Sequence, residues 1–243
     1  MKTVLITGGA TGIGKECAKL FAANGYDVII TYNKSKEKAD RLCRHANDAS
    51  LMISAYQCDI KDASQIAHVV DTIIEEHGKI DVLINNSGIA QQKLFTDISE
   101  EEWDEMFDIN TKGVFLMTKA VIKNMISRHV GKIINISSMW GQVGASCEVH
   151  YSASKAAVIG MTKALAKEVG PSSINVNCIC PGVIDTAMMS CFDDAVKKEL
   201  ADETPLCRLG QPHDVAKAAL FLAGDGAQFI TGQVIGVNGG FII

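Results

Sequence analysis

The sequence predicts an α/β fold in a single domain, in which a mostly parallel sheet of about seven strands is covered by helices on both faces. Short apolar runs alternate with longer amphipathic stretches along the 243 residues. Parallel strands need crossover connections long enough to hold a helix, so this alternation favours a doubly wound sheet. Hydrophobic residues make up 47% of the chain, enough for a sizeable core, and no linker-like stretch divides it.

The strands are expected where short runs rich in β-branched and other apolar residues stand between turn-forming residues. They are residues 3–7, 27–32, 51–57, 80–85, 131–137, 173–179 and 232–237. The helices are expected where apolar residues recur with a helical period, and the first of them ends near Gly25. They are residues 13–24, 36–47, 62–77, 100–127, 151–169 and 212–223.

Bulk properties argue against several classes of protein. The formal net charge is −5 and no basic stripe is present, so nothing favours nucleic-acid binding. No apolar run approaches the length of a membrane span, and the first strand begins by residue 3, which leaves no room for a secretory signal. We therefore expect a protein of the reducing cytoplasm.

The eight cysteines include no C-x-x-C pair, and several fall inside predicted strands or helices, where cysteine behaves as a small hydrophobe. Cys178 and Cys180 could suggest a metal pair, but no second pair of ligands accompanies them. The six histidines are scattered and form no cluster with carboxylates. We expect buried thiols and no metal.

Glycines separate the first predicted strand from the first predicted helix. Residues 3–14 read TVLITGGATGIG, with Gly8, Gly9, Gly12 and Gly14 at the turn. Glycines permit a tight turn and a close backbone approach, and a helix N-terminus favours a pyrophosphate. The spacing G-x-x-x-G-x-G departs from the commoner G-x-G-x-x-G, so a plain glycine-rich turn is the alternative.

Tyr151 and Lys155, in YSASK, lie four residues apart on a predicted helix. Positions i and i+4 share one face, so the ammonium is expected to lower the pKa of the phenol. A tyrosine tuned in this way can act as a general acid toward a carbonyl oxygen. The alternative is an ordinary solvated helix face.

These features, with others in the same order, resemble the short-chain dehydrogenase/reductase family. The matching residues are TGGATGIG, NNSG at 85–88, Asn110, Ser138, Tyr151-x-x-x-Lys155 and Pro181-Gly182. The match spans nearly the whole chain and implies a Rossmann-type fold and carbonyl reduction with a nicotinamide cofactor. A subunit that binds a dinucleotide without catalysis is the remote alternative, but such proteins typically lose the tyrosine or the lysine.

The resemblance also implies roles for the catalytic residues. Tyr151 is the general acid, Lys155 tunes it and binds the nicotinamide ribose, and Ser138 hydrogen-bonds the reacting oxygen. Asn110 is expected to hold a water that connects Lys155 to solvent. Ser137 is the rival of Ser138, and the thirteen-residue spacing to Tyr151 favours Ser138.

The cofactor is expected to contact residues at several strand ends, and the choice of dinucleotide depends on the second strand. That strand ends in Thr31-Tyr32-Asn33-Lys34-Ser35, without the Asp or Glu that usually binds an NAD ribose, so we expect NADP(H) rather than NAD(H). Lys34 is alternatively a solvated lysine, and Thr11 stands where many NADP-dependent relatives have arginine. The expected contacts are Gly8, Thr11, Gly12, Ile13, Gly14, Asn33, Lys34, Ser35, Asp59, Asn86, Gly88, Lys155, Pro181, Gly182, Ile184 and Thr186. Asp59 is alternatively a turn or helix-capping aspartate.

Residues 187–203 are interpreted as a mobile helical lid over the substrate. Met188, Met189 and Phe192 give it an apolar underside, and ordinary packing is the alternative for such a stripe. Pro181-Gly182 is expected to follow the sixth strand and to open the loop over the nicotinamide.

The resemblance leaves two substrates open. Over its whole length the chain is similar to family members that reduce 3-oxoacyl groups on acyl carrier protein, with Arg128 and Lys123 as candidate carrier contacts near the entrance. Pro171-Ser172-Ser173 lacks the second arginine expected there. Locally, around residues 139–155, the chain is similar to members that reduce the 5-aminopentanone group of elongation factor P.

Glu148, three residues before Tyr151, bears on that choice. A carboxylate there suits an ammonium-bearing substrate, although it could simply favour the positive end of the following helix. The sequence ends in VNGGFII, and three large apolar residues at a free end usually need burial. Relatives pack this tail and two long helices into a tetramer, so we expect a homotetramer.

Overall fold

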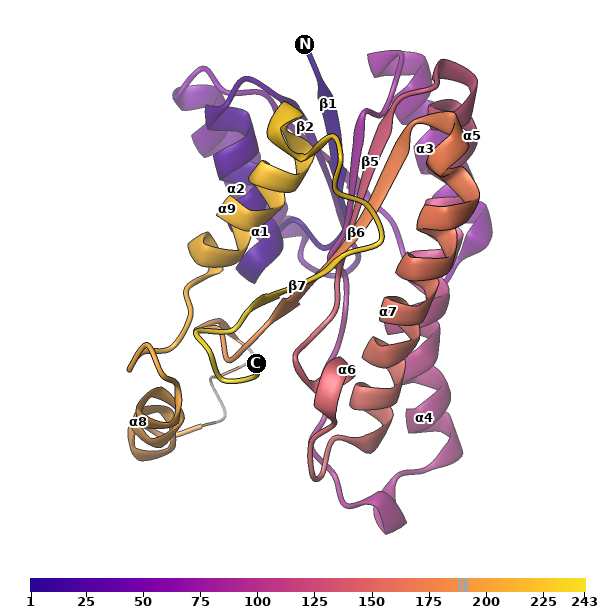
Figure 1. Cartoon of the computed structure of the whole chain (residues 1–243). Helices are drawn as coiled ribbons and strands as arrows, with labels where there is room; N and C mark the ends of the chain where they lie inside the picture. Colours follow the sequence, from indigo (N-terminus) through magenta and orange to yellow (C-terminus); the bar gives the residue numbers. More distant parts are fainter. Residues whose placement is uncertain (188, 190–191) are drawn as a thin grey trace.

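One parallel sheet organises the molecule. The computed structural model describes residues 1–187, 189 and 192–243. Within these ranges the strand order is β3-β2-β1-β4-β5-β6-β7, and every neighbouring pair is parallel (Figure 1). The strands are β1 (Thr3–Ile6), β2 (Asp27–Tyr32), β3 (Ile53–Gln57), β4 (Val82–Asn85), β5 (Gly131–Ile136), β6 (Ile174–Pro181) and β7 (Val234–Val237). The predicted fold class is confirmed.

Helices cover both faces of the sheet (Figure 1). One layer holds α1 (Gly12–Ala23), α2 (Lys36–Asp48) and α9 (Pro212–Ala223); the other holds α3 (Ala63–His77), α5 (Gly113–Arg128) and α7 (Val149–Val169). Successive residues of β1 serve opposite layers, because side chains alternate along a strand. Val4 and Ile6 belong to the core beneath α1 and α9, whereas Leu5 belongs to the core beneath α3 and α5.

The strand order reverses at β1, which pairs with β2 on one side and β4 on the other. In such sheets a ligand binds beyond the carboxyl ends of the strands at this reversal. These ends point downward in Figure 1, where α4 (Glu100–Phe107), α6 (Trp140–Val143), α8 (Asp194–Glu203) and the C-terminus gather. The site is therefore expected at this carboxyl edge.

The helix predicted over 100–127 is interrupted. Between α4 and α5 the chain makes a π-helical turn, Asp108–Lys112. The side chain of Asn110 in this turn bonds both backbone groups of Ile89, and Gly113 packs so closely on Ile60 that a Cβ would lie 2.6 Å from it. Both constraints come from distant segments, and such turns are frequent at functional sites.

Other boundaries differ by a few residues. β6 continues through Pro181 because it pairs with β7 up to Val237, so Pro181 ends the strand instead of following it. The short helix α6 was not expected. In the predicted lid, α8 forms as a helix, and Met188 lies outside the described residues. Among the described residues, no helix is long and apolar enough to cross a membrane.

Candidate active site

Four side chains meet at the carboxyl edge. Ser138 is the second residue after β5, Tyr151 and Lys155 lie one turn apart on α7, and Asn110 lies in the π-helical turn. The Lys155 ammonium is 5.8 Å from the centre of the Tyr151 ring. It also donates a 3.0 Å hydrogen bond to the carbonyl of Ile136, the last residue of β5. The fold thus brings together the residues to which catalytic roles were assigned.

The two serines after β5 have different partners. The Ser137 hydroxyl donates to the carbonyl of Lys155 at 2.8 Å, which ties β5 to α7. The Ser138 oxygen accepts from the backbone of Trp140 at 3.1 Å, and its hydroxyl hydrogen-bonds the Tyr151 phenol. Ser138, and not Ser137, is therefore the serine that faces the tyrosine.

Burial controls the protonation of Tyr151 and Lys155. It raises the pKa of Tyr151 to about 12; the Ser138 hydrogen bond opposes this shift, and the charge of Glu148 adds to it. Burial also lowers the pKa of Lys155 to about 8. The predicted lowering of the Tyr151 pKa by Lys155 is therefore wrong for the protein alone. The reason is desolvation, which disfavours both charged forms and is invisible in an i, i+4 spacing.

Asn110 is fully buried and its amide is occupied by protein partners. The carbonyl accepts from Ile89 N at 2.9 Å, and the amide nitrogen donates to Ile89 O at 2.9 Å and to Ser154 Oγ at 3.1 Å. A Cβ on Gly88 would lie 3.1 Å from Asn110 Oδ1 and 3.3 Å from Lys155 Nζ. Asn110 thus clamps the segment after β4 beside Lys155.

The glycine loop forms a cradle at the N-terminus of α1. Gly8 and Gly12 have left-handed φ values of 64° and 51°, which other residues rarely adopt. A Cβ on Gly14 would lie 2.5 Å from Asn86 Nδ2 and 2.5 Å from Gly8 O. Thr11 occupies the cap position without a side-chain cap, so the first N–H groups of α1 stay available to an anion.

Thr7 is a structural member of the cradle that sequence reasoning missed. Its hydroxyl accepts from the backbone of Asn86 at 2.9 Å and of Ser87 at 3.0 Å. In return, the Asn86 amide donates to the carbonyls of Thr7 and Gly8 at 3.0 and 3.2 Å. These bonds join the ends of β1 and β4 across the strand reversal. In the sequence, the feature that could have indicated this role is a threonine hydroxyl directly before Gly8 and Gly9.

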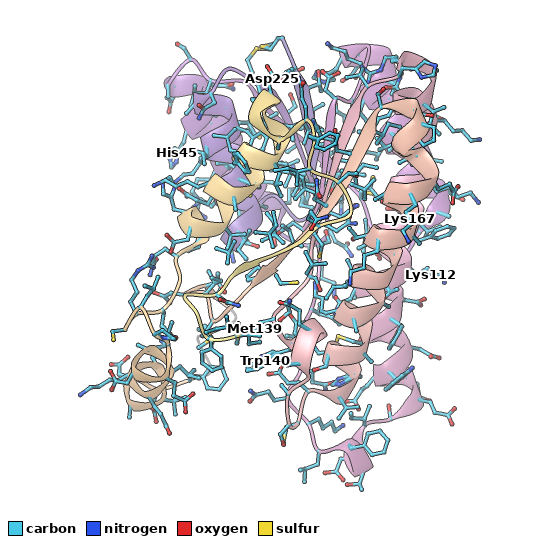
Figure 2. The ribbon with its side chains drawn as sticks, viewed as in Figure 1. His45, Lys112, Met139, Trp140, Lys167 and Asp225 are labelled. Atoms are coloured by element: carbon cyan, nitrogen blue, oxygen red, sulfur yellow. The ribbon has the colours of Figure 1, made fainter. Side chains whose placement is uncertain are left out.

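The end of β2 carries one positive side chain, Lys34, and no carboxylate among residues 31–35. Asn33 and Lys34 are exposed, and Ser35 stands at the start of α2 without a capping bond. A groove of about 760 Å³ runs between α1 and α2 and reaches Thr11 and Gly12. Its lining includes Lys15, Lys38, Arg41 and His45, the last labelled on α2 in Figure 2. Lys15, Lys38 and Arg41 were missed because helical lysines and arginines are ordinarily solvated.

Asp59 and Ile13 have simple local roles. Asp59 accepts the backbone N–H of Lys61 at 3.0 Å, as a turn aspartate does. Asp62 caps α3 instead, accepting from Ser64 and Gln65. Ile13 is the second residue of α1 and packs against the core on that face.

The segment after β6 returns to the glycine loop. Gly182 donates to the carbonyl of Val237 at 3.0 Å, and a Cβ on it would lie 2.7 Å from the backbone of Asn238. Ile184 is buried. A Cβ on Gly12 would lie 3.7 Å from Thr186 Cγ2, so this segment and the cradle face each other.

Glu148 stands at the start of α7 but does not cap it. Its side chain makes no capping bond and accepts from Gln92 Nε2 at 3.2 Å. Burial raises the pKa of this carboxyl. Its charge also acts on Tyr151, so the carboxylate lies in the electrostatic environment of the phenol.

Apolar side chains also lie at the carboxyl edge of the sheet. Met189 is buried and its N–H donates to Thr186, which indicates packing, and Phe192 is half-buried. Trp140 and Phe241 make an edge-to-face contact with ring centres 5.8 Å apart. Figure 2 shows Met139 and Trp140 at this end of the sheet, with Asp225 at the opposite end.

Comparison with known proteins decides the family. The family model described as enoyl-(acyl carrier protein) reductase matches residues 8–242. The chain belongs to the short-chain dehydrogenase/reductase family. The 3-oxoacyl-[acyl-carrier-protein] reductase FabG of Thermotoga maritima is 42% identical over 242 residues, which cover 100% of this chain and 98% of that protein.

Two further relatives carry the same name. The protein of Chlamydia trachomatis is 41% identical over 239 residues, which cover 98% of this chain and 96% of that protein. The protein of Staphylococcus aureus strain Mu50 is 38% identical over 239 residues, with coverage of 98% and 97%. As a short-chain dehydrogenase/reductase, the chain is an oxidoreductase acting on C=O and CH–OH groups.

Arg128 does not lie at the entrance of this reductase's own site. It bonds Asp81 at 2.8 Å and the carbonyl of Ile80 at 2.6 Å, and Asp81 accepts from Thr3, the first residue of β1. These residues mark the amino edge of the sheet, opposite Ser138. Lys123 is exposed toward the same end of α5. The expected position near the entrance is wrong for a single chain, because α5 runs away from the carboxyl edge.

Cys178 and Cys180 are buried free thiols beneath the site. Seven cysteines are free within the described residues, and Cys191 lies outside them. In the same part of the chain, no group of three or more His, Cys, Asp or Glu residues is arranged to hold a metal ion.

Proposed function

We propose that this enzyme reduces a 3-oxoacyl group on acyl carrier protein to the 3-hydroxyacyl group with NADPH. The observation that carries the proposal is the hydrogen-bonded pair of Ser138 and Tyr151 hydroxyls at the carboxyl edge, with Lys155 beside the tyrosine ring. Two hydroxyls that meet at one point suit a single oxygen atom on which negative charge develops. The names of relatives at 36–42% identity support this substrate.

A nicotinamide cofactor held in the cradle would supply the hydride that the carbonyl carbon accepts. The Ser138 hydroxyl donates a hydrogen bond to the carbonyl oxygen, and the Tyr151 phenol transfers its proton to that oxygen. The products are a secondary alcohol and a phenolate, which is then reprotonated from solvent by way of Lys155. The Tyr151 pKa of about 12 keeps the acid form populated before hydride transfer.

The cradle supports a dinucleotide, and its surroundings support NADP(H) over NAD(H). Gly14 lets the loop pack closely, because a Cβ there would lie 2.5 Å from both Asn86 Nδ2 and Gly8 O, and the uncapped start of α1 suits a phosphate. Lys15, Lys34 and Lys38 lie on the elements that border the adenosine end. Among the described residues that line the groove, Glu16 is the one carboxylate, and it is paired with Lys19 and His213. A 2′-phosphate would therefore meet a positive environment.

A second substrate is favoured by Glu148. This carboxylate acts electrostatically on Tyr151, is half-buried, and is held by Gln92 instead of capping α7. Such a group would pair with a substrate ammonium and would repel the acidic surface of a carrier protein. The 5-aminopentanone group of elongation factor P carries both a ketone and an ammonium, and is the alternative substrate.

One assay separates the candidates. NADPH oxidation is followed with acetoacetyl-carrier protein, with crotonyl-carrier protein and with elongation factor P bearing the ketone; NADH and Tyr151→Phe are the controls. The proposal expects turnover of acetoacetyl-carrier protein, and Glu148→Gln leaves that rate within about twofold. Turnover of the elongation factor alone, lost in Glu148→Gln, would overturn it in favour of the alternative. Turnover of crotonyl-carrier protein alone would contradict carbonyl reduction.

We further propose that the enzyme works as a homotetramer in the cytoplasm. Phe229 and Ile243 are fully exposed, and Phe115 on α5 is 47% exposed. Large apolar side chains at such positions favour burial against further copies of the chain. The seven free cysteines of the described residues are compatible with a reducing compartment.

A further inference from the structure

Residues 91–93, in the loop after β4, pair with the residues that immediately precede Tyr151 in the sequence. Gln91 bonds His150 (Oε1 to Nε2, 2.9 Å), Gln92 bonds Glu148 (3.2 Å), and the Lys93 N–H donates to the carbonyl of Cys147 at 2.7 Å. Three consecutive residues of the loop after β4 therefore pair in reverse order with residues just before and within the first turn of α7. We call these segments, residues 91–93 and 147–150, the clasp.

The side chain of Glu102, on α4, holds the clasp through hydrogen bonds to Gln91 and Lys93. Its carboxylate accepts from Gln91 Nε2 at 2.8 Å, from Lys93 Nζ at 2.8 and 2.7 Å, and from the backbone of Ser99 at 2.9 Å. The Lys93 hydrogen bond, with those of Ser99 and Gln91, lowers the pKa of Glu102 to about 2. The carboxylate stays ionised and accepts only, so it dictates which way the Gln91 amide points.

This orientation determines the tautomer of His150. The Gln91 nitrogen donates to Glu102, so the Gln91 oxygen faces the imidazole, and His150 Nε2 must carry the proton. Burial lowers the pKa of His150, which keeps the ring neutral at neutral pH. Its other nitrogen, Nδ1, is buried with no hydrogen-bond partner among the described residues. Burying an imidazole nitrogen without a hydrogen-bond partner costs free energy of folding, which an apolar side chain in the same place would avoid.

The clasp is continuous with the catalytic residues. His150 directly precedes Tyr151 at the start of α7. Two residues before Gln91, Ile89 is held by Asn110 through two hydrogen bonds of 2.9 Å. The loop is thus anchored at one end beside Lys155 and at the other beside Tyr151.

We propose that His150, held by Gln91, is a positioning residue that fixes the Tyr151 phenol opposite Ser138 for proton transfer. This inference rests on the proposed carbonyl reduction. Small displacements of an acid from the reacting oxygen cost rate without affecting cofactor binding. The Glu148 carboxylate is held by the same clasp through Gln92.

The test is a double-mutant cycle on acetoacetyl-carrier protein reduction with His150→Leu, Gln91→Leu and the double variant. Each single variant is expected to lower kcat about tenfold, with the double variant no slower, and with KM and the NADPH dissociation constant changed less than twofold. His150→Gln places a donor at the same reach and should restore kcat to within about threefold. Val149→Ala is the matched control and should leave kcat unchanged, because this exposed valine lies in the same segment but its apolar side chain makes none of the hydrogen bonds of the clasp.

Hydrogen exchange of the peptide spanning residues 147–155 gives a readout independent of activity. Exchange should accelerate in His150→Leu and Gln91→Leu but not in Val149→Ala. Additive kcat losses, or losses that His150→Gln does not restore, would overturn the positioning role. If the wild-type enzyme reduces no ketone, the proposed function fails; accelerated exchange then still supports the clasp, whereas unchanged exchange overturns it as well.

Discussion

The ammonium of Lys155 is almost fully buried at the carboxyl edge and has the carbonyl of Ile136 as a hydrogen-bond partner. Its pKa falls from 10.5 to about 8 because burial disfavours the charged form. The buried Lys155 ammonium therefore lowers the free energy of unfolding of the protein.

Lys155→Met should therefore abolish most activity and raise the free energy of unfolding by about 2 kcal/mol at pH 7. Between pH 8 and 10.5 the unfolded wild-type chain binds more protons at this residue than the folded chain does. The wild-type protein therefore gains stability as the pH rises through that window, and the difference between the two proteins narrows. Thermal unfolding of both at pH 7 and pH 10 measures this, and a wider gap at pH 10 would refute the assignment.

Ser137 and Ser138 provide a second test at the residue scale. Ser138→Ala should lower kcat by about 10²-fold with little effect on stability, because it removes a donor to the reacting oxygen. Ser137→Ala should cost about 1 kcal/mol of stability, because Ser137 bonds the Lys155 carbonyl, and should retain most of its activity. Steady-state kinetics and urea unfolding of both variants separate these effects. The reverse pattern would assign the catalytic serine to position 137.

For individual residues, the sequence predicted which residue types occur at which spacing, but not how deeply each side chain is buried or what it contacts. The i, i+4 spacing correctly placed Tyr151 and Lys155 on one helix, one turn apart. It could not indicate the burial that raises one pKa and lowers the other. Arg128 shows the same limit, because its partners Ile80 and Asp81 are distant in the sequence.

At the scale of elements, the glycine loop and α1 form the rigid half of the site. Gly14→Ala should weaken NADPH binding at least tenfold and destabilise the fold by about 1–3 kcal/mol, because its Cβ would meet Asn86 and the Gly8 carbonyl. Gly25→Ala is the matched control: Gly25 has a φ of 78° but open space around it. It should cost about 1 kcal/mol and leave the NADPH affinity unchanged. Fluorescence titration with NADPH distinguishes the two, and equal affinities would remove Gly14 from the cradle.

Local sequence patterns predicted which segments form strands and which form helices. They did not predict the interruption of the helix expected over 100–127. Short apolar runs identified the strands because the central strands β1, β2 and β4 are buried on both faces. Helical periodicity identified most helices because each packs one face on the sheet. The π-helical turn at 108–112 depends on bonds between Asn110 and Ile89, which lie far apart in the sequence. Nothing within 100–127 indicates it.

At the scale of the whole molecule, the exposed apolar side chains concern assembly. The C-terminal segment packs Phe241 against Trp140, whereas Ile243 and Phe229 remain exposed. We expect light scattering at micromolar concentration to give about four times the 26.0 kDa chain mass. Deletion of residues 241–243 should lower that mass and the activity together. A mass of one chain for the intact protein would refute the predicted tetramer.

Comparison of wild type with Tyr151→Phe in a single turnover of NADPH and acetoacetyl-carrier protein tests the central claim most directly. If Tyr151 is the acid that protonates the carbonyl oxygen, the variant should bind NADPH with unchanged affinity and reduce the ketone at least 10²-fold more slowly. A rate within about threefold of wild type would contradict the account, because the proton would then come from another group.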